Sequence, residues 1–367
     1  MKRSLDIAFF GSSLVSAYWN GAATYYRGLV RALATRGHRV TFYEPDAYER
    51  QKHRDIDDPP WAKVVVYSGT DERDVYLMLE RARTADVVVK ASGVGVWDDI
   101  LDREVAGLRR AGMTTAYWDV DAPATLERLR SNPNDPFHAL VPKFDAVFTY
   151  GGGPPVVRGY QSFGAKVCLP VYNALDPTTH HPAPPDPRWR SHLSLLANRL
   201  PDRETRMNEF FFKPARLLPE HTFVLGGNGW NKEELPPNVR PIGHVYTGDH
   251  NAFNASARMV LNVARDSMAA CGHSPATRVF EAAGAGACLI TDAWEGIEAF
   301  LEPDREILVA QDGEQVARYV RDLDRSRARQ IGIAARKRIL NQHTYARRAQ
   351  AVEALLLQDA PVGEVSA

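Results

Sequence analysis

Residues 260–298 read VLNVARDSMAACGHSPATRVFEAAGAGACLITDAWEGIE. This pattern predicts a short apolar strand, a polar loop, a helix and a second short strand. Ser274 is a favoured N-cap residue, Pro275 suits the first helical position, and Gly284 favours the end of the helix. Such a unit implies two parallel strands joined by a right-handed crossover. The predicted elements cover residues 260–264, 265–273, 274–284 and 287–291.

The polar residues of the predicted helix lie on one face. Ser274, Thr277, Arg278 and Glu281 recur at helical spacing, and the other positions are apolar or small. A helix N-terminus offers unpaired N–H groups and the positive end of the helix dipole, which suit an anion such as phosphate. The pattern therefore predicts a buried helix whose polar stripe faces an anionic ligand. The alternative is a structural ion pair between Arg278 and Glu281.

The composition is that of a globular protein without a strong overall charge. The chain has 367 residues, which favours two domains over one. It carries 45 Lys and Arg and 45 Asp and Glu residues, so no net field favours nucleic acid or an anionic membrane. We expect no integral membrane segment and no signal peptide, because no apolar run is long enough for either. Three cysteines without a CxxC pair favour a reducing, cytoplasmic location.

Strand, loop and helix units repeat through the first half of the chain. They predict an α/β domain with a doubly wound parallel sheet and polar loops at the carboxyl ends of its strands. The first of these loops, residues 11–20, lacks the G-x-G-x-x-G pattern of dinucleotide-binding proteins. The predicted strands cover residues 5–10, 38–43, 62–67, 86–91, 113–118, 144–150 and 166–170.

A Pro-rich segment without periodicity separates two such series. It contains His180 and His181, which could bind metal, but a zinc site needs three or four ligands and no third is spaced nearby. A second α/β series follows and ends in an amphipathic helix. The predicted division is an N-terminal domain 1–171, a linker 172–190, a C-terminal domain 191–343, a C-terminal helix 344–358 that crosses back to the first domain, and a flexible tail 359–367.

Several of these stretches resemble group-1 glycosyltransferases. GHSPATRVFEAAGAGACLITD (272–292) and EGIEAFLEPDREILV (295–309) are similar to the C-terminal domain of that family, and closest to its spore-maturation CgeB-like branch. LANRLPDR (196–203), LGGNGW (225–230) and the opening segment 11–45 agree with it. The resemblance implies a GT-B fold, in which two Rossmann-like domains with doubly wound parallel sheets face each other across a cleft. It also implies transfer of a sugar, such as a hexose, from a nucleotide donor to an acceptor.

The resemblance assigns roles in the second domain. Glu281 matches a family glutamate that holds the donor ribose, whereas His273 stands where the family often has another glutamate. Arg199 matches a basic residue assigned to the diphosphate, on which negative charge grows as the sugar leaves, and Arg203 is the second cation. Packing is the alternative role for Trp230. The predicted donor-binding residues are Ser12, Ser13, Asn198, Arg199, Arg203, Gly227, Asn228, Trp230, His244, Val245, Ser274, Thr277, Arg278 and Glu281.

Two acidic residues, Asp119 and Asp121, follow the predicted strand 113–118 on the acceptor side. In an inverting reaction one of them would be the general base, whereas in a retaining reaction, which the resemblance suggests, they would orient the acceptor. Helix capping is the alternative role for Asp121. Asp-Val-Asp also mimics the metal-binding DxD of another glycosyltransferase fold. The predicted catalytic residues are Asp119, Asp121, His273 and Arg199, with no metal ligand.

The sequence thus predicts a metal-independent, retaining glycosyltransferase without a cofactor. Its co-substrate would be a UDP-, dTDP- or GDP-linked sugar, and its acceptor a small molecule, a glycan or a polypeptide. Two alternatives share the architecture: a nucleotide-sugar epimerase and a catalytically silent nucleotide-binding protein.

Overall fold

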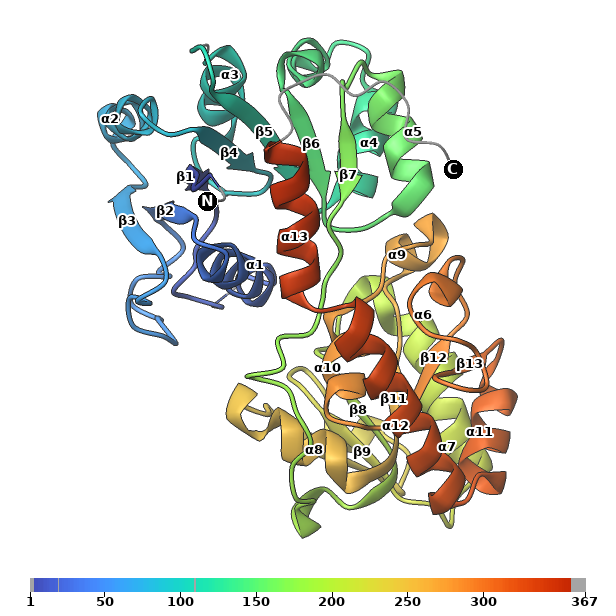
Figure 1. Ribbon diagram of the computed structural model, residues 1–367. Helices are drawn as coiled ribbons and strands as arrows, with labels where there is room; N and C mark the ends of the chain where they lie inside the picture. Colours follow the sequence, from blue (N-terminus) through green and yellow to red (C-terminus); the bar gives the residue numbers. More distant parts are fainter. Residues whose placement is uncertain (1–2, 19, 109, 358–367) are drawn as a thin grey trace. The chain divides into compact units, whose positions relative to one another are not determined.

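The computed structural model describes residues 3–18, 20–108 and 110–357 (Figure 1). The chain divides into two compact units, Met1–Tyr172 with Tyr345–Ala367 and Asn173–Thr344. The predicted flexible tail, 359–367, lies outside the described residues.

The first unit contains a seven-stranded parallel sheet in the order β3-β2-β1-β4-β5-β6-β7. Its central strands, β1 and β4, are almost wholly buried, as expected for a parallel sheet covered on both faces. The strands are β1 (Asp6–Phe10), β2 (Arg39–Asp46), β3 (Lys63–Ser68), β4 (Val87–Ala91), β5 (Thr114–Asp119), β6 (Ala146–Thr149) and β7 (Cys168–Pro170).

The last helix of the chain packs against the first helix of this unit, and both are visible in Figure 1. A Cβ at Gly28 would lie 2.2 Å from the Tyr345 ring, so the two helices approach closely at this position. Arg36 and His38 both face the buried carboxylate of Glu353. The helices of the unit are α1 (Ala23–Thr35), α2 (Glu72–Ala82), α3 (Asp98–Gly107), α4 (Ala122–Ser131), α5 (Gly153–Ser162) and α13 (Tyr345–Leu356).

The second unit contains a six-stranded parallel sheet in the order β10-β9-β8-β11-β12-β13. One buried hydrophobic cluster joins the sheet to the phenylalanines of the 210–212 turn and to the first turns of the helix from Arg325. The strands are β8 (Ser191–Leu196), β9 (Phe223–Gly226), β10 (Val239–Gly243), β11 (Ala257–Asn262), β12 (Leu289–Asp292) and β13 (Leu308–Ala310).

The helices of the second unit differ from the prediction in two places. The pattern of residues 204–217 predicts a single helix, but a π-helical turn, Asn208–Phe212, interrupts it, and a short helix lies in the expected polar loop 265–273. Helices α10 and α12 pack side by side (Figure 1). The helices are α6 (Glu204–Met207), α7 (Lys213–Leu217), α8 (His250–Ser256), α9 (Asp266–Cys271), α10 (Thr277–Gly284), α11 (Gly313–Asp322) and α12 (Arg325–Gln342).

Each sheet has one point at which the strand order reverses. It lies between β1 and β4 in the first unit and between β8 and β11 in the second. The predicted class, two Rossmann-like domains with doubly wound parallel sheets, is confirmed. In such sheets ligands bind outside the carboxyl ends of the strands at the reversal point. The loops after β8 and β11 therefore form the edge at which such a sheet binds its ligand.

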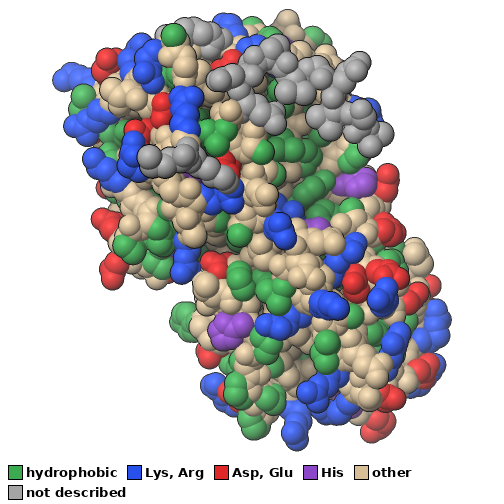
Figure 2. All heavy atoms as spheres, in the orientation of Figure 1, with side chains coloured by type: hydrophobic (Ala, Val, Ile, Leu, Met, Phe, Trp, Pro, Cys, Tyr) green, Lys and Arg blue, Asp and Glu red, His purple; other side chains and the backbone are tan. Residues whose placement is uncertain are grey.

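The surface and the cysteines add two observations. Basic and acidic side chains are interspersed on the face drawn in Figure 2. Among the described helices, none combines the length and the apolar character that a membrane crossing requires. Cys168 and Cys288 carry free thiols.

Candidate functional site

Arg278 lies at the reversal point of the second sheet. From the first turn of α10, its Nη1 donates to Asn262 Oδ1 at 3.1 Å and its Nη2 donates to the carbonyl of Leu196. Leu196 ends β8 and Asn262 ends β11, so the guanidinium bridges the two central strands. Burial, and then the positive charge of Arg203, lower the pKa of Arg278 to about 10. A cation is thus held where an α/β sheet binds its ligand.

Arg203 is a second cation near the first. It ends the 3-10 turn Pro201–Arg203 after β8, and burial lowers its pKa below the usual value. Across the described residues, its Nε is buried and has no hydrogen-bond partner. Two partly desolvated cations that repel each other are costly unless an anion lies between or beside them. The Arg203 and Arg278 pair therefore forms a candidate anion site.

A buried ion pair that the sequence did not predict lies near these two arginines. Asp292 ends β12 with no exposed surface, and Arg206 of α6 lies 2.6 Å from its Oδ2. The backbone N–H of Ala264 donates to the same carboxylate at 3.1 Å. Burial raises the pKa of Asp292, whereas Arg206 opposes that shift. A second pair, Arg265 with Asp202 at 2.5 Å, links the loops after β11 and β8.

The start of α10 differs from the prediction. The helix begins at Thr277 with Ala276 as N-cap. Ser274 is therefore not the N-cap, and Pro275 is not the first helical residue. Asn173 holds this segment instead: its Nδ2 donates to the carbonyl of Pro275 at 3.3 Å, and its Oδ1 accepts from Thr277 Oγ1 at 3.2 Å. These contacts keep residues 274–276 extended. Ser274 is buried just ahead of the helix, and Arg278 and Glu281 lie one turn apart on it.

The glycine turn after β9 packs against the loop after β8. Gly227 has a φ of +116°, and a Cβ there would lie 2.1 Å from the carbonyl oxygen of Ala197. Asn228 N–H donates to Asn198 Oδ1 at 2.9 Å. Trp230 Nε1 donates to the Ala197 carbonyl at 2.8 Å, and its ring packs on the hydrophobic core. The turn therefore brings Asn198 and Asn228 together, while Trp230 makes packing contacts.

Replacement of Gly227 by alanine tests this close approach. The alanine must adopt a left-handed conformation and also displace the loop at Ala197. Backbone strain alone should lower the free energy of unfolding by about 1–3 kcal/mol. Urea unfolding measures the loss. Gly248→Ala is the matched control, because no atom lies within 4 Å of the added Cβ. Equal stability of the two variants would contradict the packing described here.

Arg199, predicted to bind diphosphate, lies in a different environment. Its guanidinium is 2.9 Å from Glu204 and 2.6 Å from Glu234, and lies over the Trp230 ring at 5.7 Å. These carboxylates raise its pKa further. Because two acids already balance this charge, Arg199 offers less attraction to an anion than Arg203 does.

His244 and Val245, predicted for the nucleotide pocket, follow β10 in different ways. His244 is exposed and its ring lies edge-on to that of Tyr246 at 4.7 Å. Val245 is buried in a small cluster with Trp189 and Phe253. The predicted nucleotide base would therefore meet the side chain of His244 but only the backbone of Val245.

His273 has a constrained backbone beside α10. Its φ is +45°, and its N–H donates to the carbonyl of Glu295 at 2.6 Å. Its ring packs onto Gly296, where an added Cβ would lie 1.9 Å from Nδ1. A left-handed conformation in a residue with a side chain is costly and frequently marks a functional loop.

Glu281 lies one turn along α10 from Arg278 and is partly buried. Its Oε1 is 3.7 Å from Nε2 of His180, in the segment that the sequence assigned to the linker. His250 of α8 completes a group of three whose potential ligand atoms lie within 4.8 Å of one another. Sequence spacing could not reveal this group, because its members are separated by 70 and 31 positions.

In the first unit, Ser12 and Ser13 are buried and hydrogen-bonded to the protein. Ser12 Oγ donates to Asn20 Oδ1, and Ser13 Oγ donates to Glu44 Oε1, both at 2.9 Å. Glu44 also accepts from the backbone N–H of Leu14 at 2.6 Å. The Glu44 carboxylate, within β2, therefore anchors the loop after β1. The two hydroxyls hold this loop in shape.

Asp119 and Asp121 differ sharply in exposure. Asp119 has no exposed surface, and its carboxylate accepts from Ser92 Oγ at 2.8 Å and from the hydroxyl of Tyr160. Asp121 is exposed and occupies the N-cap position of α4, without a side-chain cap bond. Of the two, only Asp121 presents its carboxylate to solvent.

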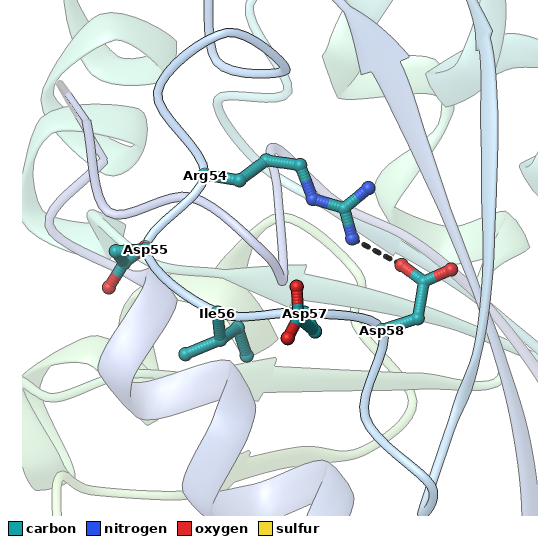
Figure 3. A pocket seen from close by; sticks show the side chains of 5 residues that line it. All are labelled: Arg54, Asp55, Ile56, Asp57 and Asp58. Atoms are coloured by element: carbon teal, nitrogen blue, oxygen red, sulfur yellow. Dashed lines mark hydrogen bonds and ion pairs between the residues drawn. The ribbon is translucent and has the colours of Figure 1, made fainter.

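Figure 3 shows a pocket in the first unit formed by Arg54, Asp55, Ile56, Asp57 and Asp58. Arg54 is paired with Asp58, and Asp55 is held by Arg27 at 2.7 Å. All five lining residues come from one loop, and none is a predicted site residue. The pocket therefore does not add to the candidate site.

Part of the sequence matches a known family model. Residues 203–354 match the family model described as glycosyl transferase-like. The matched segment begins at Arg203 and includes Arg278 and Glu281. No curated protein sequence gives a significant match to this chain. The CgeB-like branch therefore stays a prediction.

Solved structures share the fold over nearly the whole chain. HepE of Anabaena, in complex with UDP and glucose, has a TM-score of 0.66 at 13% identity, with 96% of this chain and 99% of that chain covered. Sucrose-phosphate synthase of Thermosynechococcus elongatus has a TM-score of 0.66 at 14% identity, with 97% and 99% covered. An alpha-glucosyltransferase in complex with UDP-glucose and DNA has a TM-score of 0.69 at 12% identity, with 97% and 100% covered. The fold is that of GT-B glycosyltransferases.

Proposed function

We propose that the protein is a glycosyltransferase that moves a sugar from a nucleotide-diphosphate sugar to an acceptor hydroxyl. The observation that carries the proposal is the pair of cations, Arg203 and Arg278, at the reversal point of the second sheet. The similarity of residues 203–354 to glycosyl transferase-like proteins supports it. So do the UDP and UDP-glucose complexes among the structures with the same fold.

The chemistry explains why two cations suit this site. When the bond between sugar and diphosphate breaks, negative charge grows on the diphosphate oxygens. Arg278 is fixed by Leu196 and Asn262, so its remaining N–H groups are already oriented. Arg203 brings a second charge from the adjacent loop. We assign the diphosphate to these two residues ahead of Arg199, because Glu204 and Glu234 balance the charge of Arg199.

We assign the other predicted residues to the remaining parts of the donor. Glu281 would accept hydrogen bonds from the ribose hydroxyls, with His244, the backbone of Val245 and the Gly227 turn close to the base. His273 and Ser274 would face the sugar and the adjacent phosphate. We assign UDP ahead of dTDP and GDP as the nucleotide, because solved structures with this fold hold UDP or UDP-glucose.

The acceptor step would need no strong protein base in a retaining reaction. Asp121 is the exposed carboxylate that could orient an acceptor hydroxyl, whereas Asp119 would act by holding the loop after β5. Because the two arginines supply the charge that a metal supplies in other transferases, we propose a metal-independent transfer with no further cofactor. A small molecule, glycan or polypeptide in the cytoplasm is the proposed acceptor, and nucleic acid is not.

Replacement of Glu281 by glutamine tests the nucleotide site. It should weaken UDP binding by roughly 1–3 kcal/mol, because a charged acceptor for the ribose hydroxyls is lost. Calorimetric titration with UDP measures the change. Glu298→Gln, an exposed position after β12, is the matched control. No loss in Glu281→Gln relative to this control would remove Glu281 from the site.

A panel of nucleotide sugars tests the reaction. A transferase releases free nucleotide when an acceptor is present, whereas an epimerase changes the sugar and releases none. A silent binding protein does neither, although UDP would still raise its melting temperature, and the rise would grow with UDP concentration. Failure of UDP, dTDP and GDP alike to stabilise the protein would contradict the proposed function.

A further inference from the structure

His180, His250 and Glu281 converge in the second unit from three separate elements. His180 lies in the segment before β8, His250 is the first residue of α8, and Glu281 lies in the middle of α10. One potential ligand atom of each lies within 4.8 Å of the other two. His180 Nε2 and Glu281 Oε1 lie 3.7 Å apart. Two imidazoles and a carboxylate form a ligand set that zinc uses in proteins.

Each histidine has a second partner that orients its ring. Nδ1 of His180 lies 3.0 Å from Thr179 Oγ1, and Nε2 of His250 lies 3.2 Å from the carbonyl oxygen of Val245. Because a carbonyl only accepts, Nε2 of His250 must carry the proton in that bond, and the other ring nitrogen keeps its lone pair. Metal-binding histidines commonly show this arrangement, with one nitrogen on the metal and the other donating to a carbonyl or hydroxyl.

Burial leaves one of these nitrogens in need of a partner. The His180 side chain is 3% exposed, and within the described residues its Nε2 has no hydrogen bond. A buried polar atom without a partner lowers stability, and such atoms in a native structure call for an explanation.

The backbone fixes the two histidines beside each other. Asn251 Nδ2 donates to the carbonyl of Thr179 at 2.9 Å, and Asn251 Oδ1 accepts from the N–H of His181 at 3.1 Å. The amide therefore binds the backbone on both sides of His180 and follows His250 directly in α8. The ring centroids of the two histidines lie 5.9 Å apart. The cluster is thus organised before any ligand binds.

We propose that His180, His250 and Glu281 bind one divalent transition-metal ion of the zinc class. Zn–N distances of about 2.0–2.1 Å in a tetrahedral site place neighbouring ligand atoms about 3.4 Å apart. The 3.7 Å separation of His180 and Glu281 is close to that value, and the other separations are at most 4.8 Å. Three protein ligands leave a fourth position for water.

The surrounding charges set the expected affinity. Glu281 is the acid in the cluster, while Arg278 lies near enough to lower the pKa of His250. The metal ion would bind close to the positive charge of Arg278, so we expect weaker metal binding than at a structural zinc site. If Glu281 also holds ribose, metal and nucleoside compete for one carboxylate. That consequence rests on the proposed function, whereas the metal site does not.

Cobalt binding tests the site directly, because tetrahedral Co²⁺ with nitrogen ligands shows strong visible absorption bands. The full chain is used without a histidine tag, which would bind the same ions. Wild-type protein should develop these bands with one equivalent of Co²⁺ and lose them when Zn²⁺ is added. Absence of the bands, together with no zinc binding by calorimetry, would overturn the proposal.

Variants locate the ion. His250→Gln should weaken Co²⁺ binding at least tenfold, and His180→Gln should do the same. His181→Ala is the matched control, because His181 is exposed and adjacent to His180 in the chain. If His180→Gln does not fold, as circular dichroism would show, His250→Gln decides alone. Equal Co²⁺ binding by His250→Gln and His181→Ala would overturn the assignment.

Uridine separates this proposal from the proposed function. It carries the ribose but no phosphate to chelate the metal. Saturating Co²⁺ should weaken uridine binding severalfold in the wild type and leave it unchanged in His250→Gln. Failure of uridine and UDP to bind at all would reject the nucleotide site, while the cobalt bands would still support the metal site. Unchanged uridine affinity in the presence of bound Co²⁺ would show that Glu281 is not shared.

Discussion

Arg203→Ala should weaken UDP binding by roughly 1.5–3 kcal/mol, which is about 10- to 150-fold, without loss of stability. The affinity falls because a charge-assisted contact to the diphosphate is lost. The melting temperature should change little, because the substitution removes the burial cost of a cation and its repulsion of Arg278 but also removes its attraction to Asp202 and Asp292. Calorimetry and thermal melting of the same samples measure both effects.

Arg199→Ala is the control that distinguishes the two arginines as ligands of the diphosphate. Its guanidinium is paired with Glu204 and Glu234, so we expect a smaller change in UDP affinity than for Arg203→Ala. Arg203→Lys should retain part of the affinity, because an ammonium supplies charge but not the bidentate geometry of a guanidinium. A larger affinity loss in Arg199→Ala than in Arg203→Ala would return the diphosphate to Arg199, as the sequence resemblance assigned it.

The fold could be predicted because the relevant signals are local. Buried parallel strands are short apolar runs, and glycine, proline and polar clusters separate them from amphipathic helices. The predicted strand at residues 287–291 is shifted by one or two positions from β12 (Leu289–Asp292). The predicted start of helix α10 was wrong. Asn173 binds Pro275 and Thr277 from about a hundred positions away, and these contacts override the local capping preference of Ser274.

The candidate site was only partly predictable for the same reason. Arg278 and Glu281 lie one turn apart on a helix, so their common face is visible in the sequence. The contacts of Arg278 with Asn262 and Leu196 depend on the sheet order, which spacing does not reveal.

The cluster of His180, His250 and Glu281 shows most clearly what sequence spacing does not predict. The sequence has His180 and His181 side by side and no third ligand nearby, which argued against a metal. In the structure the two histidines separate: His181 is exposed, and His180 turns inward to His250 and Glu281. Neighbours along the chain are poor guides to a site that is assembled from three elements.

Asp292→Ala is the stability change with the largest expected effect. The carboxylate is fully buried, and it binds Arg206 at 2.6 Å and the N–H of Ala264 at 3.1 Å. Removing one partner of a buried ion pair leaves a charge and a donor without compensation, which typically costs 3–5 kcal/mol. Arg206 is 21% exposed and can turn partly toward water, so we expect a loss of about 2–4 kcal/mol.

Urea unfolding measures this loss, and two further variants interpret it. Asp292→Asn keeps the shape and an acceptor for Ala264 but removes the charge, so it should be intermediate. Asp322→Ala removes the acid of an exposed pair with Arg321 and should leave stability almost unchanged. Because Arg206 and Arg203 lie on adjacent turns after β8, Asp292→Ala should also weaken UDP binding. A stable Asp292→Ala protein with normal UDP affinity would show that this ion pair does not support the anion site.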